Sequence, residues 1–388
     1  MSVNGYYIVN GERIDNKLYA MIKATETKSD LAWWYYDEQF DLATRTYKSR
    51  VPLTTLYKQR AQQLRDKYDY LILNYSGGSD SHNILHSFLQ NNIKLDLIYV
   101  QWPESLVDKG IYTPNSLDKS NANFHSEWDL VLKKDLEWLG KNRPEIKIEI
   151  GDWTKTVREK FYKDDIFANN VSNLPSIARA QKQNTFSRTE GELALQGKRV
   201  GSIFGVDKPN VVKKGDKWFF YFTDTACMTQ PNPDNPDGIE YFYWSPEFPA
   251  IAVEQAYLMK ELFERRPDLV YLVQARSERI AQDPTFSQWP YERHYAEYHK
   301  TAELAKLVCY PHWDFNRFQA DKPFAVLDGF NMGMRAWDNI LTVLPDFNRV
   351  QNAWQYHWTS YLDKIDPKFM RSKDTVSVMK SRWHLLIN

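Results

Sequence analysis

The chain has 388 residues with 50 basic and 50 acidic side chains, so its net charge is zero and no overall field draws it to nucleic acid or to an anionic membrane. Its two cysteines, Cys227 and Cys309, lie far apart, which excludes a Cys-x-x-Cys zinc or redox site and favours a reducing compartment. No apolar run approaches membrane-spanning length and the first residues do not resemble a signal peptide, so we expect a cytoplasmic protein with no membrane partner.

The first 65 residues are predicted to form a mixed N-terminal extension. Tyr6 to Val9 and Arg13 to Ile14 flank an Asn-Gly dipeptide, which favours a two-residue type I′ turn and so predicts a hairpin. The apolar run at 31–36 is either a strand or a short packed helix. A helical pattern follows at 53–67, with its apolar residues on one face.

Residues 66–270 alternate strand and helix patterns, which predicts one α/β domain. Short apolar or alternating runs predict four strands, at 70–73, 95–100, 146–150 and 200–204. Helical spacing predicts the helices between them, after Ser81, at 122–139 and at 174–195. This alternation implies a parallel sheet with right-handed crossovers and helices on both faces. Because ligands of such sheets bind beyond the carboxyl ends of the strands, the loop after the first strand, Gln101 and Asp207 should share one edge.

The alternation ends after the fourth strand. Residues 211–213 and 217–222 flank Lys-Gly-Asp, which predicts a hairpin. The segment at 231–238 is too rich in proline and asparagine for regular structure, and 239–244 could be an edge strand. Helical spacing follows at 249–263. We treat residues 271–388 as a separate, mostly helical C-terminal region.

The stretch between the first strand and its helix is the main functional signal. It reads Ser76-Gly77-Gly78-Ser79-Asp80-Ser81. Two adjacent glycines allow a tight turn without side chains that would block a ligand, and the amides at a helix N-terminus attract an anion. We interpret the stretch as a phosphate cradle, although it is neither a Walker loop nor a dinucleotide fingerprint. The alternative is an ordinary strand–helix turn capped by Ser or Asp.

Ser-Gly-Gly-Ser-Asp-Ser resembles the Ser-Gly-Gly-x-Asp-Ser signature of the PP-loop (N-type) ATP pyrophosphatase superfamily, which includes asparagine synthetase and GMP synthetase. The resemblance implies the parallel sheet of the HUP (adenine nucleotide alpha-hydrolase-like) fold, and ATP cleaved between its α and β phosphates. It implies that the cradle holds the departing pyrophosphate, and that main chain at the end of the second strand holds the adenine. The implied ATP and pyrophosphate ligands are Ser76, Gly77, Gly78, Ser79, Asp80, Ser81, Tyr99, Val100 and Gln101.

Four charged residues are candidates for catalysis. Asp80, inside the turn, is placed to bind a Mg²⁺ ion that bridges the phosphates, or it simply caps the helix. Asp207 is a second metal-ligand candidate or a turn residue, and Lys208 could stabilise the leaving pyrophosphate or lie at the surface. The family resemblance also suggests Lys322, which follows Tyr310-Pro311, as a phosphate-binding lysine; the alternative is a surface lysine at a helix start. A second stretch with a looser resemblance to the family is Glu240 to Pro246.

The small number of cysteines narrows the choice among PP-loop reactions. Thiolation, sulfonucleotide reduction and deazaguanine synthesis depend on cysteines in many relatives, so the two lone cysteines favour an asparagine synthetase-like ligase. We expect a stand-alone synthetase that adenylates a carboxyl or carbonyl oxygen and transfers nitrogen. Only 75 residues precede the cradle and residue 2 is a serine, so we expect no glutamine hydrolysis by this chain, and ammonia, an amine or a separate amidotransferase subunit would supply the nitrogen.

Two other functions stay open. One is a PP-loop enzyme that modifies nucleotides or nucleic acid, for which a local basic face beside the cradle would be needed. The other is a non-catalytic nucleotide-binding or structural protein that retains the fold. The acceptor substrate is not specified by the sequence.

Overall fold

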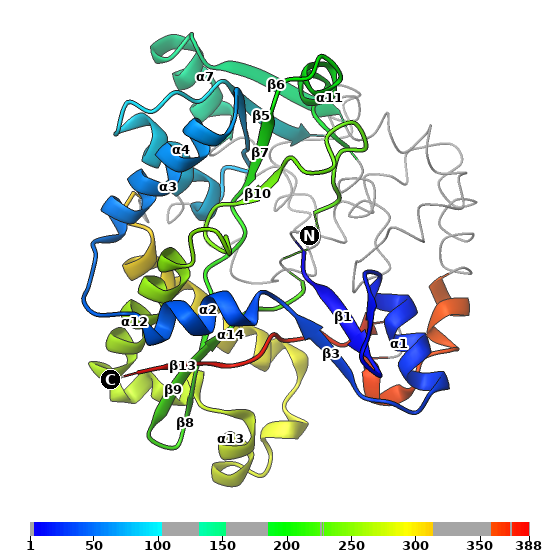
Figure 1. The fold of residues 1–388 in the computed structure, drawn as a ribbon. Helices are drawn as coiled ribbons and strands as arrows, with labels where there is room; N and C mark the ends of the chain where they lie inside the picture. The colour runs from blue at the N-terminus through cyan, green and yellow to red at the C-terminus, as the bar shows by residue number, and fades with distance from the viewer. Residues whose placement is uncertain are drawn as a thin grey trace, which may run out of the picture.

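The computed structural model describes residues 4–102, 132–152, 185–225, 227, 229–312, 358–372 and 375–387. The predicted helical residues 122–131 and 174–184, and Lys322, lie outside these ranges. Within them, a central parallel sheet and three smaller antiparallel sheets, one of them two-stranded, are packed together with helices (Figure 1). Among the described residues, no helix combines the length and the apolar character needed to cross a bilayer.

The central sheet confirms the predicted α/β class. Its five strands are all parallel and run in the order β10-β7-β4-β5-β6. They are β4 (Tyr70–Asn74), β5 (Leu97–Trp102), β6 (Lys147–Asp152), β7 (Val200–Phe204) and β10 (Ile239–Tyr241). From β4 the chain first adds β5 and β6 on one side and then β7 and β10 on the other, an arrangement consistent with a Rossmann-like fold.

Helices cover both faces of this sheet. The helices at the sheet are α3 (Leu53–Lys67), α4 (Ser79–Leu89), α7 (Lys133–Asn142) and α11 (Arg188–Leu195). Apolar residues of α4 and α7 belong to the same buried core as Leu71 and Leu73 of β4, whereas Leu193 of α11 packs against a cluster that includes Ile72. Because successive strand residues point to opposite faces, this division places α4 and α11 on opposite sides of β4.

The N-terminal segment forms its own small sheet, in the order β2-β1-β3. The predicted hairpin is confirmed by β1 (Tyr6–Val9) and β2 (Glu12–Ile14), with Asn10 at φ 51° and Gly11 at φ 76°, the positive values that a type I′ turn requires. The apolar run at 31–36 contains a strand, β3 (Leu31–Trp34). Helix α1 (Lys17–Glu26) packs against this sheet.

The third sheet joins distant parts of the chain. The predicted hairpin is formed by β8 (Asn210–Lys214) and β9 (Lys217–Tyr221), and β13 (His384–Leu386) pairs with β9 from the far end of the sequence. Helix α2 (Asp37–Arg45) packs on β13, and α12 (Ala250–Glu264) contacts both α2 and α14 (Tyr291–Cys309).

The rest of the described C-terminal region contains short elements. They are η3 (Pro267–Val273), α13 (Arg276–Gln282), η4 (Phe286–Gln288), η5 (Pro367–Phe369), β11 (Met370–Ser372) and β12 (Thr375–Val376). The region therefore adds strands to the helices that we expected there. The boundaries at residues 65 and 270 stay predictions.

One buried carboxylate ties three segments together. Asp224 forms an ion pair with Lys17, with 2.6 Å between nitrogen and oxygen, and each side chain is 1% exposed. The Tyr7 hydroxyl donates to the same oxygen at 2.9 Å, and the Met379 amide donates to the other oxygen at 3.0 Å. A buried charge is tolerated only when it is paired and hydrogen-bonded. This contact therefore holds β1, α1 and the C-terminal segment around Met379 against residue 224.

A second buried network holds the edge strand β10. Arg60 of α3 forms an ion pair with Glu240 at 2.7 Å, and their side chains are 0% and 8% exposed. Glu240 also accepts hydrogen bonds from the Tyr68 hydroxyl at 2.7 Å and from Lys67 at 2.8 Å. Because of these cations, the pKa of Glu240 lies below its usual value even though burial alone would raise it. Glu240, in a stretch that resembles the family, is thus a structural anchor.

Candidate functional site

The cradle residues form the loop and helix start at the carboxyl end of β4. Gly77 has a φ of +76°, a left-handed conformation that side chains rarely adopt. Helix α4 begins at Ser79, and its N-cap, Gly78, provides no side-chain cap. The first helical hydrogen bond runs from the His82 amide to the Gly78 carbonyl at 3.0 Å. The N–H groups at 79–81 precede that bond, so they lie at the helix end where an anion would bind.

The serine hydroxyls brace this loop. The Ser81 hydroxyl accepts a hydrogen bond from the Ser76 amide and lies 3.2 Å from the Ser76 hydroxyl. The Ser76 hydroxyl accepts from the Gly78 amide at 3.3 Å. Ser79 and Ser81 are buried, whereas Ser76 is exposed. The loop therefore has a defined shape before any phosphate binds, and contact between these hydroxyls and phosphate stays a prediction.

The loop after β7 packs directly against the cradle. A Cβ atom on Gly205 would lie 3.0 Å from the Ser81 amide nitrogen and 3.1 Å from the Asp80 Cβ atom, so the glycine allows the close approach. Strands β4 and β7 are neighbours, and the chain extends from β4 in both directions along the sheet. The cradle and the segment from Gly205 to Lys208 therefore meet at the topological switch point, where ligands of α/β sheets bind.

Two tyrosines from distant elements hold Asp80. The Tyr310 hydroxyl, just after α14, donates a hydrogen bond to the Asp80 carboxylate. The Tyr243 hydroxyl, after β10, donates to the Asp80 main-chain carbonyl at 2.8 Å. Burial raises the pKa of Asp80, the positive charge of Lys208 opposes this rise, and the negative charge of Asp207 adds to it. Asp80 is therefore not the N-cap of α4, which is Gly78, and its binding of Mg²⁺ stays a prediction.

Asp207 and Lys208 lie beside Asp80, as their position after β7 predicts. The Lys208 ammonium forms an ion pair with the Asp207 carboxylate and lies 5.5 Å from the centre of the Tyr310 ring. Lys208 is buried, with 7% of its surface exposed, so the alternative of a surface lysine is wrong. Among the described residues, no three carboxylate, imidazole or thiol groups are close enough to hold a metal ion. Asp80 and Asp207 could hold Mg²⁺ only with phosphate or water oxygens as further ligands.

The residues expected at the adenine are part of β5. Tyr99 pairs with Asn74 of β4, and its carbonyl accepts a hydrogen bond from the Tyr75 amide at 2.8 Å. Val100 pairs with β6, and the Gln101 side chain donates to the Thr185 carbonyl at 2.7 Å. Because backbone groups alternate along a strand, the main chain of Gln101 faces the same side as that of Tyr99, toward the end of β4. Lys322, the remaining candidate, lies outside the described residues.

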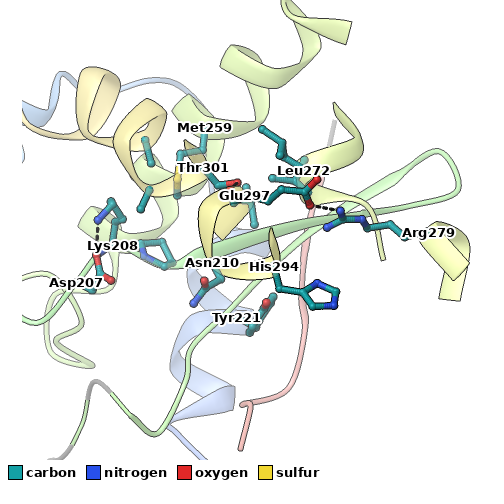
Figure 2. Close-up of a pocket in the computed structure, with 15 residues that line it drawn as sticks. Asp207, Lys208, Asn210, Tyr221, Met259, Leu272, Arg279, His294, Glu297 and Thr301 are labelled. Carbon is teal, nitrogen blue, oxygen red and sulfur yellow. Dashed lines mark hydrogen bonds and ion pairs between the residues drawn. The ribbon is translucent and has the colours of Figure 1, made fainter. Parts of the chain in front are cut away.

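A cavity opens next to Lys208 (Figure 2). It has a volume of about 180 Å³ and extends between α14, η3 and the start of β8. Asp207 and Lys208 line one end, and an ion pair between Arg279 and Glu297 lies at the other. Lys208 therefore borders both the cradle edge and this cavity.

Sequence reasoning missed the roles of Gly205, Tyr243 and Tyr310. Tyr243 and Tyr310 lie in the two stretches with a loose resemblance to the PP-loop family, so that likeness was the signal that could have assigned them. Gly205 directly follows the fourth predicted strand, where a close approach to the neighbouring loop was foreseeable. No family model, curated protein or solved structure matches this chain.

Proposed function

We propose that the protein is an ATP-dependent synthetase of the PP-loop type that forms AMP and pyrophosphate, with its sheet arranged as in the HUP fold. The observation that carries this proposal is the meeting of an uncapped helix start, Asp80 and buried Lys208 at the switch point between β4 and β7. Numbered by appearance, the sheet order reads 5-4-1-2-3, which agrees with the strand order of Rossmann-like nucleotide-binding sheets.

The cradle would bind the β and γ phosphates of ATP. The amides at 79–81 and the positive end of the α4 dipole supply hydrogen bonds and partial positive charge. Lys208 adds a full positive charge at the same edge, where it stabilises the charge that develops on the departing pyrophosphate. The adenine would lie beyond the end of β4, within reach of the main chain of Gln101.

The acidic residues suit a magnesium ion bound together with the nucleotide. One carboxylate oxygen of Asp80 accepts the hydrogen bond from Tyr310, and the other could bind the ion. Asp207 could provide another ligand. Mg²⁺ accepts one or two carboxylates together with phosphate oxygens and water, and it supplies neutralisation of phosphate charge. Burial is the largest cause of the raised pKa of Asp80, and the negative charge of Asp207 adds to it, so a cation held between the two carboxylates would offset that second contribution.

The chemistry is a substitution at phosphorus followed by one at carbon. A carboxylate oxygen of the acceptor bonds to the α-phosphorus, the bond from that phosphorus to the bridging oxygen breaks, and its electron pair leaves with pyrophosphate. A nitrogen nucleophile then attacks the acyl carbon, AMP leaves with the electron pair, and the nitrogen loses a proton. Ammonia, an amine substrate or a separate amidotransferase subunit would supply the nitrogen.

The test measures the products of ATP turnover with Mg²⁺ and pooled carboxylic acids and amines. We expect AMP and pyrophosphate, and we expect them to be lost in Asp80→Asn and strongly reduced in Lys208→Met. Lys214→Met, which removes an exposed lysine at the end of β8, is the matched control and should behave as the wild type. ADP and phosphate as the products, or full activity of Asp80→Asn, would refute the proposal.

A further inference from the structure

The far end of the cavity beside Lys208 carries a preorganised pair of opposite charges. Arg279 of α13 and Glu297 of α14 form an ion pair, and their side chains are 14% and 17% exposed. The Arg279 guanidinium also lies 4.1 Å from the centre of the Phe286 ring and 5.6 Å from that of Trp289. Stacking on aromatic rings restricts the guanidinium to one orientation, so its remaining N–H donors have a fixed direction.

The cavity is long enough to separate this pair from the proposed reaction centre. Its lining follows one face of α14, with Glu297 and Thr301 (Figure 2) and then Ala302 and Ala305. Eight residues of α-helix correspond to about 12 Å at 1.5 Å per residue. Apolar side chains line the intervening wall, namely Val211, Met259, Leu272 and Val273. A ligand that touches both ends must therefore be extended, and Asn210 and Thr301, which also line the cavity, offer partners for one polar group in its middle.

The charges of the lining balance. Among the described lining residues, Lys208 and Arg279 are positive, and Asp207 and Glu297 are negative. His294 adds no charge at neutral pH, because burial and the neighbouring arginines hold its pKa below the usual value. A head group with its own pair of opposite charges would match Arg279 and Glu297, whereas a further carboxylate of the ligand would lie beside Lys208.

We propose that the cavity holds the acceptor of the synthetase reaction, and that this acceptor is an α-amino acid with its reactive carboxyl group about 12 Å from the head group. Arg279 binds the α-carboxylate, and Glu297 binds the α-ammonium. The α-carbon places these two charges side by side, as the ion pair does. The inference rests on the proposed function, since it takes the carboxyl end beside Lys208 as the group that attacks the α-phosphorus. A short acceptor such as aspartate cannot reach both ends.

The experiment uses two probes that differ by one group. Nε-succinyl-L-lysine carries an amino acid head group and a carboxyl group about ten bonds away, whereas N-succinylcadaverine lacks the α-carboxylate. We expect the full-length protein with Mg²⁺ and ATP to bind the first probe in calorimetry and to form pyrophosphate in response. Loss of a charge-assisted hydrogen bond predicts roughly 10- to 100-fold weaker binding of the second probe. Aspartate should not stimulate pyrophosphate formation.

Two variants and a control assign the head-group contacts. Arg279→Met and Glu297→Gln should each raise the KM for Nε-succinyl-L-lysine by roughly 10- to 100-fold. Arg266→Met removes an arginine that is paired with Asp268 at the surface, and it should leave that KM unchanged. ATP affinity, measured separately, should be the same in all three variants, which also shows that each of them is folded.

The outcomes separate the two proposals. If ATP does not bind, or yields ADP, the proposed function fails. If ATP binds but Nε-succinyl-L-lysine does not, or if aspartate serves as well, the acceptor class proposed here is wrong. If Arg279→Met and Arg266→Met have the same KM, the Arg279–Glu297 pair only ties α13 to α14, and the inference is overturned while the ATP site stands.

Discussion

Replacing Glu240 by glutamine tests whether the buried network of β10 supports the site. Glutamine keeps the shape of the side chain, but its amide nitrogen is a donor that would face donors of Arg60, Lys67 or Tyr68. Because Arg60 is fully buried, the variant leaves a cation without its counter-charge. Breaking a buried ion pair costs about 3–5 kcal/mol, and since Lys67 is partly exposed we expect a loss near the lower end, about 3 kcal/mol.

Urea denaturation followed by tryptophan fluorescence gives the free energy of unfolding of each variant. The double variant Arg60→Met/Glu240→Met removes both charges and should recover part of the stability that Glu240→Gln loses. The pH dependence adds a second readout. The folded-state pKa of Glu240 is lowered, so its contribution is present above the unfolded pKa of about 4.3 and is lost as the pH falls through the folded value. A loss below about 1 kcal/mol in Glu240→Gln, the value of an exposed pair, would refute the reasoning.

Three further predictions concern the site and its frame. Gly205→Ala should weaken ATP binding, measured by calorimetry, because its Cβ atom would push the loop after β7 away from Asp80 and Ser81; unchanged affinity would show that the loop yields at no cost. Tyr310→Phe removes a hydrogen bond that lowers the pKa of Asp80, so the acidic limb of the pH profile of pyrophosphate formation should move to higher pH, and a shift to lower pH would contradict this. Asp224→Asn should lower the free energy of unfolding by about 3 kcal/mol in urea denaturation, because Lys17 loses its buried counter-charge, and a near-neutral effect would show that water replaces it.

Secondary structure was predicted best where the spacing of the apolar residues and the turn-forming residues indicate the same element. The apolar run that became β4, the helical face of α3 and the Asn-Gly turn between β1 and β2 each follow from local rules, and the structure confirms them. The shared edge of the cradle and Asp207 followed from the topology of parallel sheets.

Contacts across long sequence separations were beyond such rules. The hydrogen bond from Tyr310 to Asp80 spans 230 positions in the sequence. The residues around a tyrosine that follows a helix do not indicate which distant residue its hydroxyl will contact. The same holds for β13, whose three residues pair with β9 although nothing in their pattern indicates it. The burial of Lys208 also depends on the position of α14, so sequence alone could not separate it from a surface lysine.

The tie at Asp224 also has a consequence for how the chain folds as it is made. Lys17 and Tyr7 are synthesised early, but their buried partner is residue 224, and the Met379 amide completes that contact. At about 5–20 residues per second, the N-terminal strands wait roughly 20–75 s before Met379 is added. During that time the Lys17 ammonium and the apolar face of β1 stay open to solvent and to other nascent chains. Slower translation would lengthen this exposure, so the yield of folded protein should depend on chaperones more than its final contacts suggest.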